Sequence, residues 1–323
     1  CIIAGLLHNH TAASLPHNHT GGTMTEPDEL YTMRNLFWLG NYQLAINESN
    51  SLHRLAKHLN PIRDEFVYRS YLALGQYDIV IGEIQDTPST PLALRAIRQL
   101  ALYLSKKSSY EVVLSNLEAL ADEASKTSQA TIYYLVLATV HVHGDNIKDA
   151  LIATEGQSTL ELSAYAVQLL LRMDRPDLAQ QRLALMKSVD EDSALTQLAT
   201  AWVSMRTGGA KGMAEAANIY EDLSEKYGAS VMLMTGLAVS KMHQGLFDEA
   251  ETHLQEALNK DPSNADCLAN IITVSYHLDK PPEVIARFVS QLRNKAPEHP
   301  LLQGLTNFES AYDRVTAQLA GGN

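Results

Sequence analysis

A repeat of about 34 residues constrains the fold of this chain more than any other feature of its sequence. The string LGNYQLAI at residues 39–46 returns 35 positions later, at residues 74–81, as LGQYDIVI. Each string predicts the end of one helix, a tight turn at glycine, and a second helix that opens with an aromatic residue. A period of this length indicates stacked helical hairpins, each of which packs mainly on its neighbours.

One unit, residues 231–264, shows the repeat most fully. Small residues stand where two helices must approach closely, larger apolar residues fill the space between units, and a proline ends the second helix. These positions hold Met234, Leu237, Ala238, Gly245, Phe247, Ala250, Leu254, Ala257 and Pro262. Their order matches the tetratricopeptide pattern, in which each unit is a pair of helices.

A small residue early in the second helix of each unit recurs along most of the chain. These anchors are Ala45, Val80, Val113, Ala150, Ala179, Ala216, Ala250 and Val284. They predict an all-α fold, a tetratricopeptide-like right-handed superhelix (an α-solenoid) of about eight helical hairpins. The amphipathic residues 298–320 predict a C-terminal capping helix, and the glycine-rich residues 207–212 predict a flexible loop between two helices.

The first 23 residues differ from the rest of the chain. They contain the string HNHT twice and precede the first methionine, Met24. Nothing in this stretch predicts a scaffold that would hold its histidines in place for a metal ion. We expect residues 1–23 to be a disordered extension and residues 24–323 to form the solenoid.

Charge and motif content argue against several classes of function. The formal net charge is −12, and an acidic surface repels nucleic acid and anionic lipid. The sequence contains no HExxH, GxSxG or GxGxxG motif, and His141 and His143 lie two positions apart, on different faces of a helix. We therefore expect no enzyme activity, no catalytic, cofactor-binding or metal site, no small-molecule substrate, no nucleic acid and no membrane insertion.

The inner face of such a superhelix is lined by the first helix of each hairpin. Positions 2, 5, 9 and 12 of the units point into this groove, and here they are mostly apolar. The candidate partner-binding residues are Ile132, Leu135, Val142, Leu195, Leu198, Trp202, Met232, Val239, Met242 and Tyr276. A contiguous apolar strip normally has a protein partner to cover it. We expect about a third of these residues to pack against adjacent helices instead.

Tetratricopeptide co-chaperones place Lys and Asn at positions 5 and 9 to clamp a peptide carboxylate. Here those positions hold Leu135 and Thr139 in one unit, and Thr235 and Val239 in another. The chain is therefore not expected to bind a free carboxylate. A generic tetratricopeptide adaptor, which binds a peptide in another trafficking or chaperone complex, stays open as the alternative function.

Several further strings run in a fixed order from about residue 28 to about residue 314. They are DEL at 28–30, RN at 34–35, GNYQ at 40–43, DED at 190–192, LTQLATAW at 195–202, EAE at 249–251, EALNKD at 256–261 and KPPEV at 280–284. Together these strings closely resemble the epsilon subunit family of coatomer, the coat of COPI vesicles.

The resemblance implies a structural subunit without enzymatic activity. Its partner would be the C-terminal region of the coatomer alpha subunit, which it would bind and stabilise within a heteromeric complex. It would be cytoplasmic, peripheral on Golgi membranes and COPI vesicles through the coat, and would serve Golgi-to-ER and intra-Golgi transport. The groove residues named above are carried over only as candidates for that contact.

Overall fold

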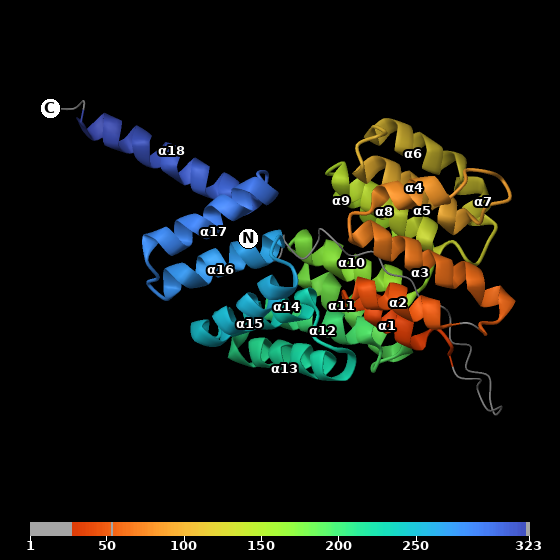
Figure 1. Ribbon diagram of the computed structural model, residues 1–323, viewed down its shortest axis with the longest axis horizontal. Coiled ribbons are helices and arrows are strands. Elements are labelled where there is room, and N and C mark those ends of the chain that lie inside the picture. The colour runs from red at the N-terminus through yellow and green to blue at the C-terminus, as the bar shows by residue number, and fades with distance from the viewer. Residues whose placement is uncertain (1–27, 53, 321–323) are drawn as a thin grey trace. The chain divides into compact units, whose positions relative to one another are not determined.

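The computed structural model describes residues 28–52 and 54–320, and throughout these residues the regular secondary structure is helical (Figure 1). The expected extension, residues 1–23, lies outside the described residues. The chain divides into two compact units. The N-terminal unit comprises the described residues up to Gly208 together with Glu225–Gly228, and the C-terminal unit comprises Gly209–Ser224 and the residues from Ala229 onward.

The N-terminal unit alternates the first (A) and second (B) helices of successive hairpins. Its A helices are α1 (Tyr31–Trp38), α3 (Asn60–Ala73), α5 (Leu92–Leu104), α8 (Thr131–His143), α10 (Leu160–Arg172) and α12 (Ala194–Thr207). Its B helices are α2 (Tyr42–Ser51), α4 (Tyr77–Glu83), α6 (Tyr110–Ala119), α9 (Ile147–Ala153) and α11 (Pro176–Val189). The short helices η2 (Lys57–Leu59) and α7 (Ala121–Ser125) lie in the connections.

The C-terminal unit continues the alternation. It contains Gly209–Ser224 of α13 (Gly209–Tyr227), together with α14 (Val231–His243), α15 (Phe247–Lys260), α16 (Ala265–His277), α17 (Pro282–Lys295) and α18 (Pro300–Ala320). Eight A–B pairs followed by α18 thus occupy the described residues, and the predicted all-α solenoid class is confirmed.

The turn inside a hairpin has the same backbone form in most units. Gly40, Gly75 and Gly245 have φ of 81°, 73° and 78°, and in the first of these turns the amide of Asn41 donates to Leu36 O at 2.8 Å. Such a bond from the residue after the left-handed position back to the A helix satisfies a carbonyl that the helix end leaves open. The glycines that revealed the repeat therefore mark positive-φ turns.

Four hairpins place a non-glycine residue at this left-handed position. Lys106, Asp145, Asp174 and Asp279 have φ between 48° and 58°. Asp is among the few L-residues that adopt this conformation readily, because its side chain bonds to the nearby backbone. The same positive-φ turn thus recurs in hairpins that have no glycine at this position.

The repeat anchors lie in the closest helix contacts. Seven of the eight, from Ala45 to Ala250, have no exposed surface, as expected of small side chains at close helix contacts. The eighth anchor was placed one residue too early. Val284 is half-buried, whereas Ile285 is buried and stands fourth in α17, as Ala250 does in α15.

The expectation of a flexible loop at residues 207–212 is wrong. Gly208, with φ of 80°, ends α12, and α13 begins at the next residue. The inserted residues therefore extend the N-terminal end of α13, and the break between the two helices falls on Gly208 and Gly209, which both have positive φ.

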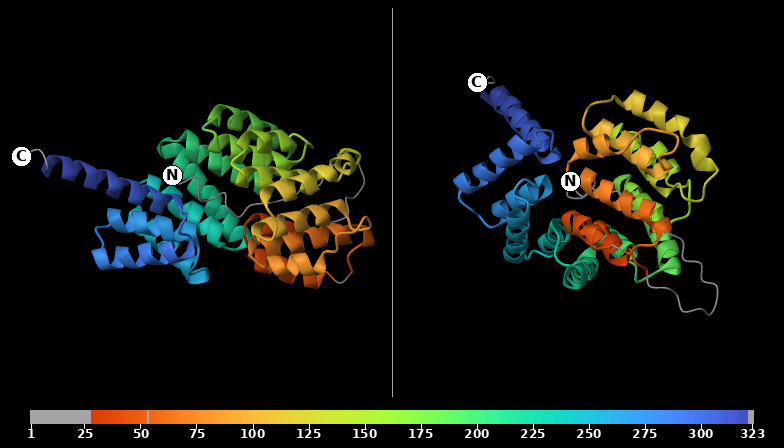
Figure 2. Two further views of the ribbon diagram at one scale, coloured as in Figure 1. Left: turned by 90° about the horizontal axis from the view of Figure 1, so that it is seen from above. Right: turned by 45° about the vertical axis from the view of Figure 1, so that its right-hand side comes forward.

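Only the first turn of α18 packs on the last hairpin. Leu302 is buried in a cluster with Leu268, Ile272 and Leu292, and Leu301 packs against the same cluster. Beyond this turn α18 diverges from α17 in every view (Figures 1 and 2). The remainder of its apolar face is not used to cap the C-terminal unit.

Candidate protein-interaction surface

The structure places most of the ten candidate groove residues in the helix packing. Six have an exposed fraction of 7% or less: Ile132, Leu135, Leu195, Leu198, Val239 and Met242. This share is larger than the expected third. Because these side chains already contact neighbouring helices, changing them would alter the core of the chain as well as any surface they contribute to.

The other four candidates are accessible to different degrees. Val142 is half-buried against the main core cluster, and Trp202 is half-buried against the cluster formed by α10, α11 and α12. Met232 is also half-buried, and Tyr276, at the end of α16, is 58% exposed. Partner binding by these residues stays a prediction.

The A helices of the N-terminal unit also carry a buried charged cluster that the sequence patterns did not indicate. Arg69 Nη2 donates to Glu161 Oε1 at 2.7 Å, and both side chains are 2% exposed or less. The guanidinium of Arg69 also lies over the rings of Phe37 and Phe66, with its Cζ 4.6 Å and 5.2 Å from the ring centroids. We call Arg34, Glu65, Arg69 and Glu161 the arginine–glutamate cluster.

Burial controls the titration of this cluster. It raises the pKa of Glu161 to about 7, although Arg69 and the indole of Trp38 act in the opposite direction. Burial likewise raises the pKa of Glu65 to about 7 against the attraction of Arg69, and it lowers the pKa of Arg34. Each shift has the sign expected when a charged form loses hydration.

The arginine–glutamate cluster lies where the coil of the N-terminal unit closes. Helix α1 contacts α12, and Trp38 of α1 packs against the cluster of α10, α11 and α12. Arg69 and Glu161 join α3 to α10 across 92 residues of sequence. The inner side of this unit is therefore filled in part by its own side chains.

The C-terminal unit contains a surface cavity of about 400 Å³ between α16 and α17. Its lining is largely apolar, with one basic and one acidic residue: Tyr276, Asp279, Lys280, Pro282, Ile285, Ala286 and Val289. Lys280 Nζ lies 2.9 Å from Glu251 Oε2, which ties the α16–α17 turn to α15. The exposed candidate Tyr276 is thus one of the residues that line this cavity.

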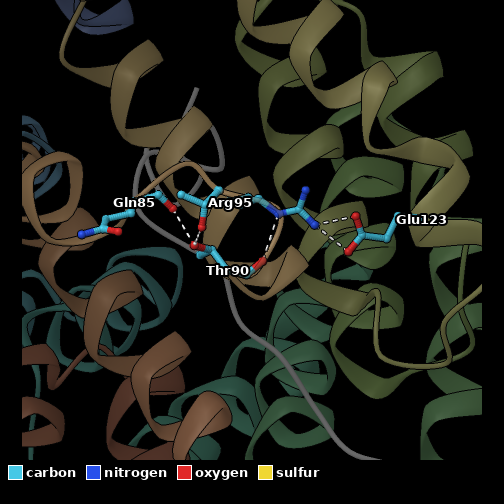
Figure 3. Close-up of polar contacts among 5 residues, drawn as sticks. Gln85, Thr90, Arg95 and Glu123 are labelled. Atoms are coloured by element: carbon cyan, nitrogen blue, oxygen red, sulfur yellow. Dashed lines mark hydrogen bonds and ion pairs between the residues drawn. The ribbon is translucent and has the colours of Figure 1, made fainter.

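A second polar arrangement connects loops rather than forming a site (Figure 3). Arg95 Nη2 donates to both carboxylate oxygens of Glu123 at 2.5 Å, and its Nε donates to Thr90 O at 3.0 Å. Thr90 Oγ1 in turn donates to Gln85 O at 2.7 Å. The α4–α5 loop is thereby fixed to α7.

The described residues offer no evident centre for metal chemistry. Within residues 28–52 and 54–320 there is no group of three or more His, Cys, Asp or Glu side chains that could hold a metal ion. His141 Nδ1 lies 3.2 Å from Tyr110 Oη, whereas the ring of His143 meets Tyr103 edge-on. In the same part of the chain, no helix has the length and apolar character needed to cross a membrane.

Comparison with known sequences identifies relatives along nearly the whole chain. The family model described as "Coatomer epsilon subunit" matches residues 26–320. "Coatomer subunit epsilon-1" of Arabidopsis thaliana is 40% identical over 299 residues, covering 92% of this chain and 99% of the relative. "Coatomer subunit epsilon-1" of Oryza sativa subsp. japonica is 41% identical over 297 residues, covering 92% and 100%. The Dictyostelium discoideum "Coatomer subunit epsilon" is 31% identical, covering 88% and 97%.

Solved structures share the fold at low sequence identity. A tetratricopeptide repeat protein from Parabacteroides merdae has a TM-score of 0.55 at 15% identity, over 82% of this chain and 96% of that one. A chain of the APC/C hetero-tetramer Cut9–Hcn1 has a TM-score of 0.59 at 12% identity, over 86% of this chain and 54% of that one. At these identities the likeness concerns the helical-repeat architecture alone.

Proposed function

Because this chain belongs to the coatomer epsilon subunit family, we propose that it is a non-enzymatic structural subunit of the COPI coat that binds and stabilises the C-terminal region of the alpha subunit. The single observation that carries this proposal is the family match over residues 26–320. Binding takes place in a heteromeric complex on the cytoplasmic side of Golgi membranes and on COPI vesicles. The step served is Golgi-to-ER and intra-Golgi transport.

The character of the described surface supports a protein ligand. The accessible candidates include Trp202 in the N-terminal unit and, separately, Met232 and Tyr276 in the C-terminal unit. Large aromatic and Met side chains are enriched in the cores of protein interfaces. The cavity beside Tyr276 would accept one apolar side chain of the partner, as interface anchors usually fill such hollows. Buried candidates such as Leu198 and Val239 hold the A helices that present these residues.

The direct test is co-elution of the full chain with the C-terminal region of the alpha subunit on a size-exclusion column. A stable one-to-one complex at low and moderate salt is expected. Separate elution at both salt concentrations would contradict the proposal, and it would leave the generic tetratricopeptide adaptor as the function to test next.

A matched pair of variants locates the contact. Tyr276→Ala removes an aromatic ring beside the cavity, and we expect it to weaken the complex about tenfold or more. Leu185→Ala on α11 removes a side chain of similar exposure, 60%, that is outside the candidate groove residues, and should leave affinity unchanged. If both variants bind the alpha subunit with equal affinity, Tyr276 is not part of the contact.

A further inference from the structure

Helix α18 carries an apolar face that the described part of the chain leaves uncovered. Phe308, Tyr312, Val315 and Leu319 are between 54% and 73% exposed. Figures 1 and 2 show why, since α18 diverges from α17 after its first turn. Contiguous apolar surface of this kind usually marks an interaction site in a folded protein.

The spacing of this face indicates what kind of element would cover it. Apolar residues follow one another at intervals of four, three, four, three and four positions, and they are Leu301, Leu305, Phe308, Tyr312, Val315 and Leu319. The alternation of four and three places these residues at the a and d positions of heptads, which form the narrow apolar seam between two helices of a coiled coil. A helix that buries its side on a globular core shows a wider stripe. The spacing of these residues therefore favours a helix as the partner that covers them.

The residues that flank the seam permit close approach. They are mostly small or uncharged, with one exception, Glu309, and comprise Gly304, Glu309, Ala311, Thr316 and Gln318. Residues 298–320 as a whole carry three carboxylates, Glu298, Glu309 and Asp313, against a single arginine, Arg314. A helix with basic residues beside its own apolar seam would complement this charge.

A second copy of the chain fits the seam less well than a heterologous helix does. The exposed part of the seam, from Leu305 to Leu319, covers about two heptads, fewer than the roughly three to four that mark a self-sufficient coiled coil. Two copies would also bring together chains of formal net charge −12 each. A partner already held elsewhere on the chain would instead meet the seam at high effective concentration, so a short contact suffices.

We propose that the α18 seam, Leu305, Phe308, Tyr312, Val315 and Leu319, docks an amphipathic helix with basic flanks that belongs to the C-terminal region of the alpha subunit. This inference rests on the proposed function. It gives the partner a second contact, on α18, in addition to the groove. The two contacts strengthen each other because both must open before the partner leaves.

The test uses two double variants of the full chain. Phe308→Ser with Leu319→Ser removes two seam side chains that are 72% and 73% exposed, so folding of the C-terminal unit is unaffected. Thr306→Ala with Ala317→Ser changes two exposed positions outside the seam on the same helix. With the C-terminal region of the alpha subunit as probe, the seam variant should bind about tenfold more weakly or worse, and the matched control should bind as the unchanged chain does.

Amide hydrogen exchange gives a second readout that does not depend on a substitution. Amides of residues 305–319 should exchange at least about tenfold more slowly in the complex than in the free chain, because a docked helix opens less often. Equal affinity of the seam variant, or unchanged exchange in α18, would overturn the inference while leaving the proposed function intact. A homodimer of the free chain that the seam variant loses would assign the face to a second copy and would also overturn it. Failure of the unchanged chain to bind the probe would overturn both.

Discussion

Arg69 on α3 and Glu161 on α10 form a fully buried ion pair, with Arg69 Nη2 2.7 Å from Glu161 Oε1. The two helices belong to the second and fifth hairpins. In a stack of repeats most contacts join neighbouring units, so a pair across 92 residues marks the place where the N-terminal unit closes on itself.

Replacing one residue of this pair should destabilise the chain more than replacing both residues. Among the described residues, Arg69 Nε and Nη1 and Glu161 Oε2 have no hydrogen-bond partner, so the network is only partly satisfied. Glu161→Leu leaves Arg69 buried without its carboxylate and should lower the free energy of unfolding by about 3–5 kcal/mol. Arg69→Met combined with Glu161→Leu should lose less than the single variant, with urea unfolding as the measurement. A double variant less stable than Glu161→Leu would contradict this.

The stability of the N-terminal unit should fall as the pH rises from about 4.5 to about 7. Burial raises the pKa of Glu161 from 4.5 to about 7, so in this window the folded chain binds more protons than the unfolded chain. The stabilisation is complete below pH 4.5 and is lost as pH passes the folded pKa, by at most about 3 kcal/mol.

Glu161→Gln isolates this contribution. The amide keeps an oxygen for Arg69 but does not titrate, so the difference in urea midpoint between pH 5 and pH 8 should shrink relative to the unchanged chain. Glu309→Gln, at an exposed position on α18, is the matched control and should leave the difference unchanged. An identical pH dependence in Glu161→Gln would mean that Glu161 is ionised throughout.

Two glycines within helices should respond oppositely to replacement by alanine. A Cβ on Gly236 of α14 would lie 2.6 Å from Cζ of Tyr220, whose side chain is buried. Gly236→Ala should therefore cost about 1–3 kcal/mol through overpacking. A Cβ on Gly304 of α18 meets no atom within 4 Å. Gly304→Ala should raise helix content slightly, since alanine favours a helix by about 1 kcal/mol over glycine.

Thermal unfolding followed by circular dichroism distinguishes the two variants. A melting temperature of Gly236→Ala equal to that of the unchanged chain would show that the ring of Tyr220 shifts freely. A lower melting temperature for Gly304→Ala would show that α18 has close neighbours along its length.

Much of the fold could be predicted because a repeat makes each packing requirement visible several times. The anchors from Ala45 to Ala250 recur at the A–B crossings, where only a small side chain fits, and the period follows from them. The turns were harder to predict from the sequence, since Asp145 and Asp174 adopt the positive-φ conformation that Gly40 adopts in the first hairpin. The beginning of α13 was missed because glycine-rich sequence is common in loops and the helix there is stabilised by its context.

The side chains of the inner surface could be predicted only in part. Position within the repeat identifies A-helix residues, but it does not separate Leu198, which is buried, from Tyr276, which is exposed. That distinction depends on which neighbouring side chains cover each position. The pairing of Arg69 with Glu161 has no local signal either, because it arises from closure of the coil across several units.

Cys267 should be inert to thiol reagents in the folded chain. Burial raises the pKa of its thiol to about 12, and Thr235 Oγ1 lies 2.9 Å from Sγ. At pH 8 only about one molecule in 10⁴ would carry the reactive thiolate even if the reagent had access. In a Cys1→Ser background, which leaves Cys267 as the only cysteine, a disulfide reagent should label the native chain many times more slowly than the chain in urea.

The urea dependence of this labelling reports on the C-terminal unit, whereas both tryptophans, Trp38 and Trp202, report on the N-terminal unit by fluorescence. Repeat arrays lose cooperativity between distant units, so the labelling midpoint and the fluorescence midpoint should differ. Arg69→Met with Glu161→Leu should then move only the fluorescence midpoint. Coincident midpoints that shift together in this variant would mean that the two units unfold as one, and rapid labelling without urea would mean that Cys267 is accessible in the folded state.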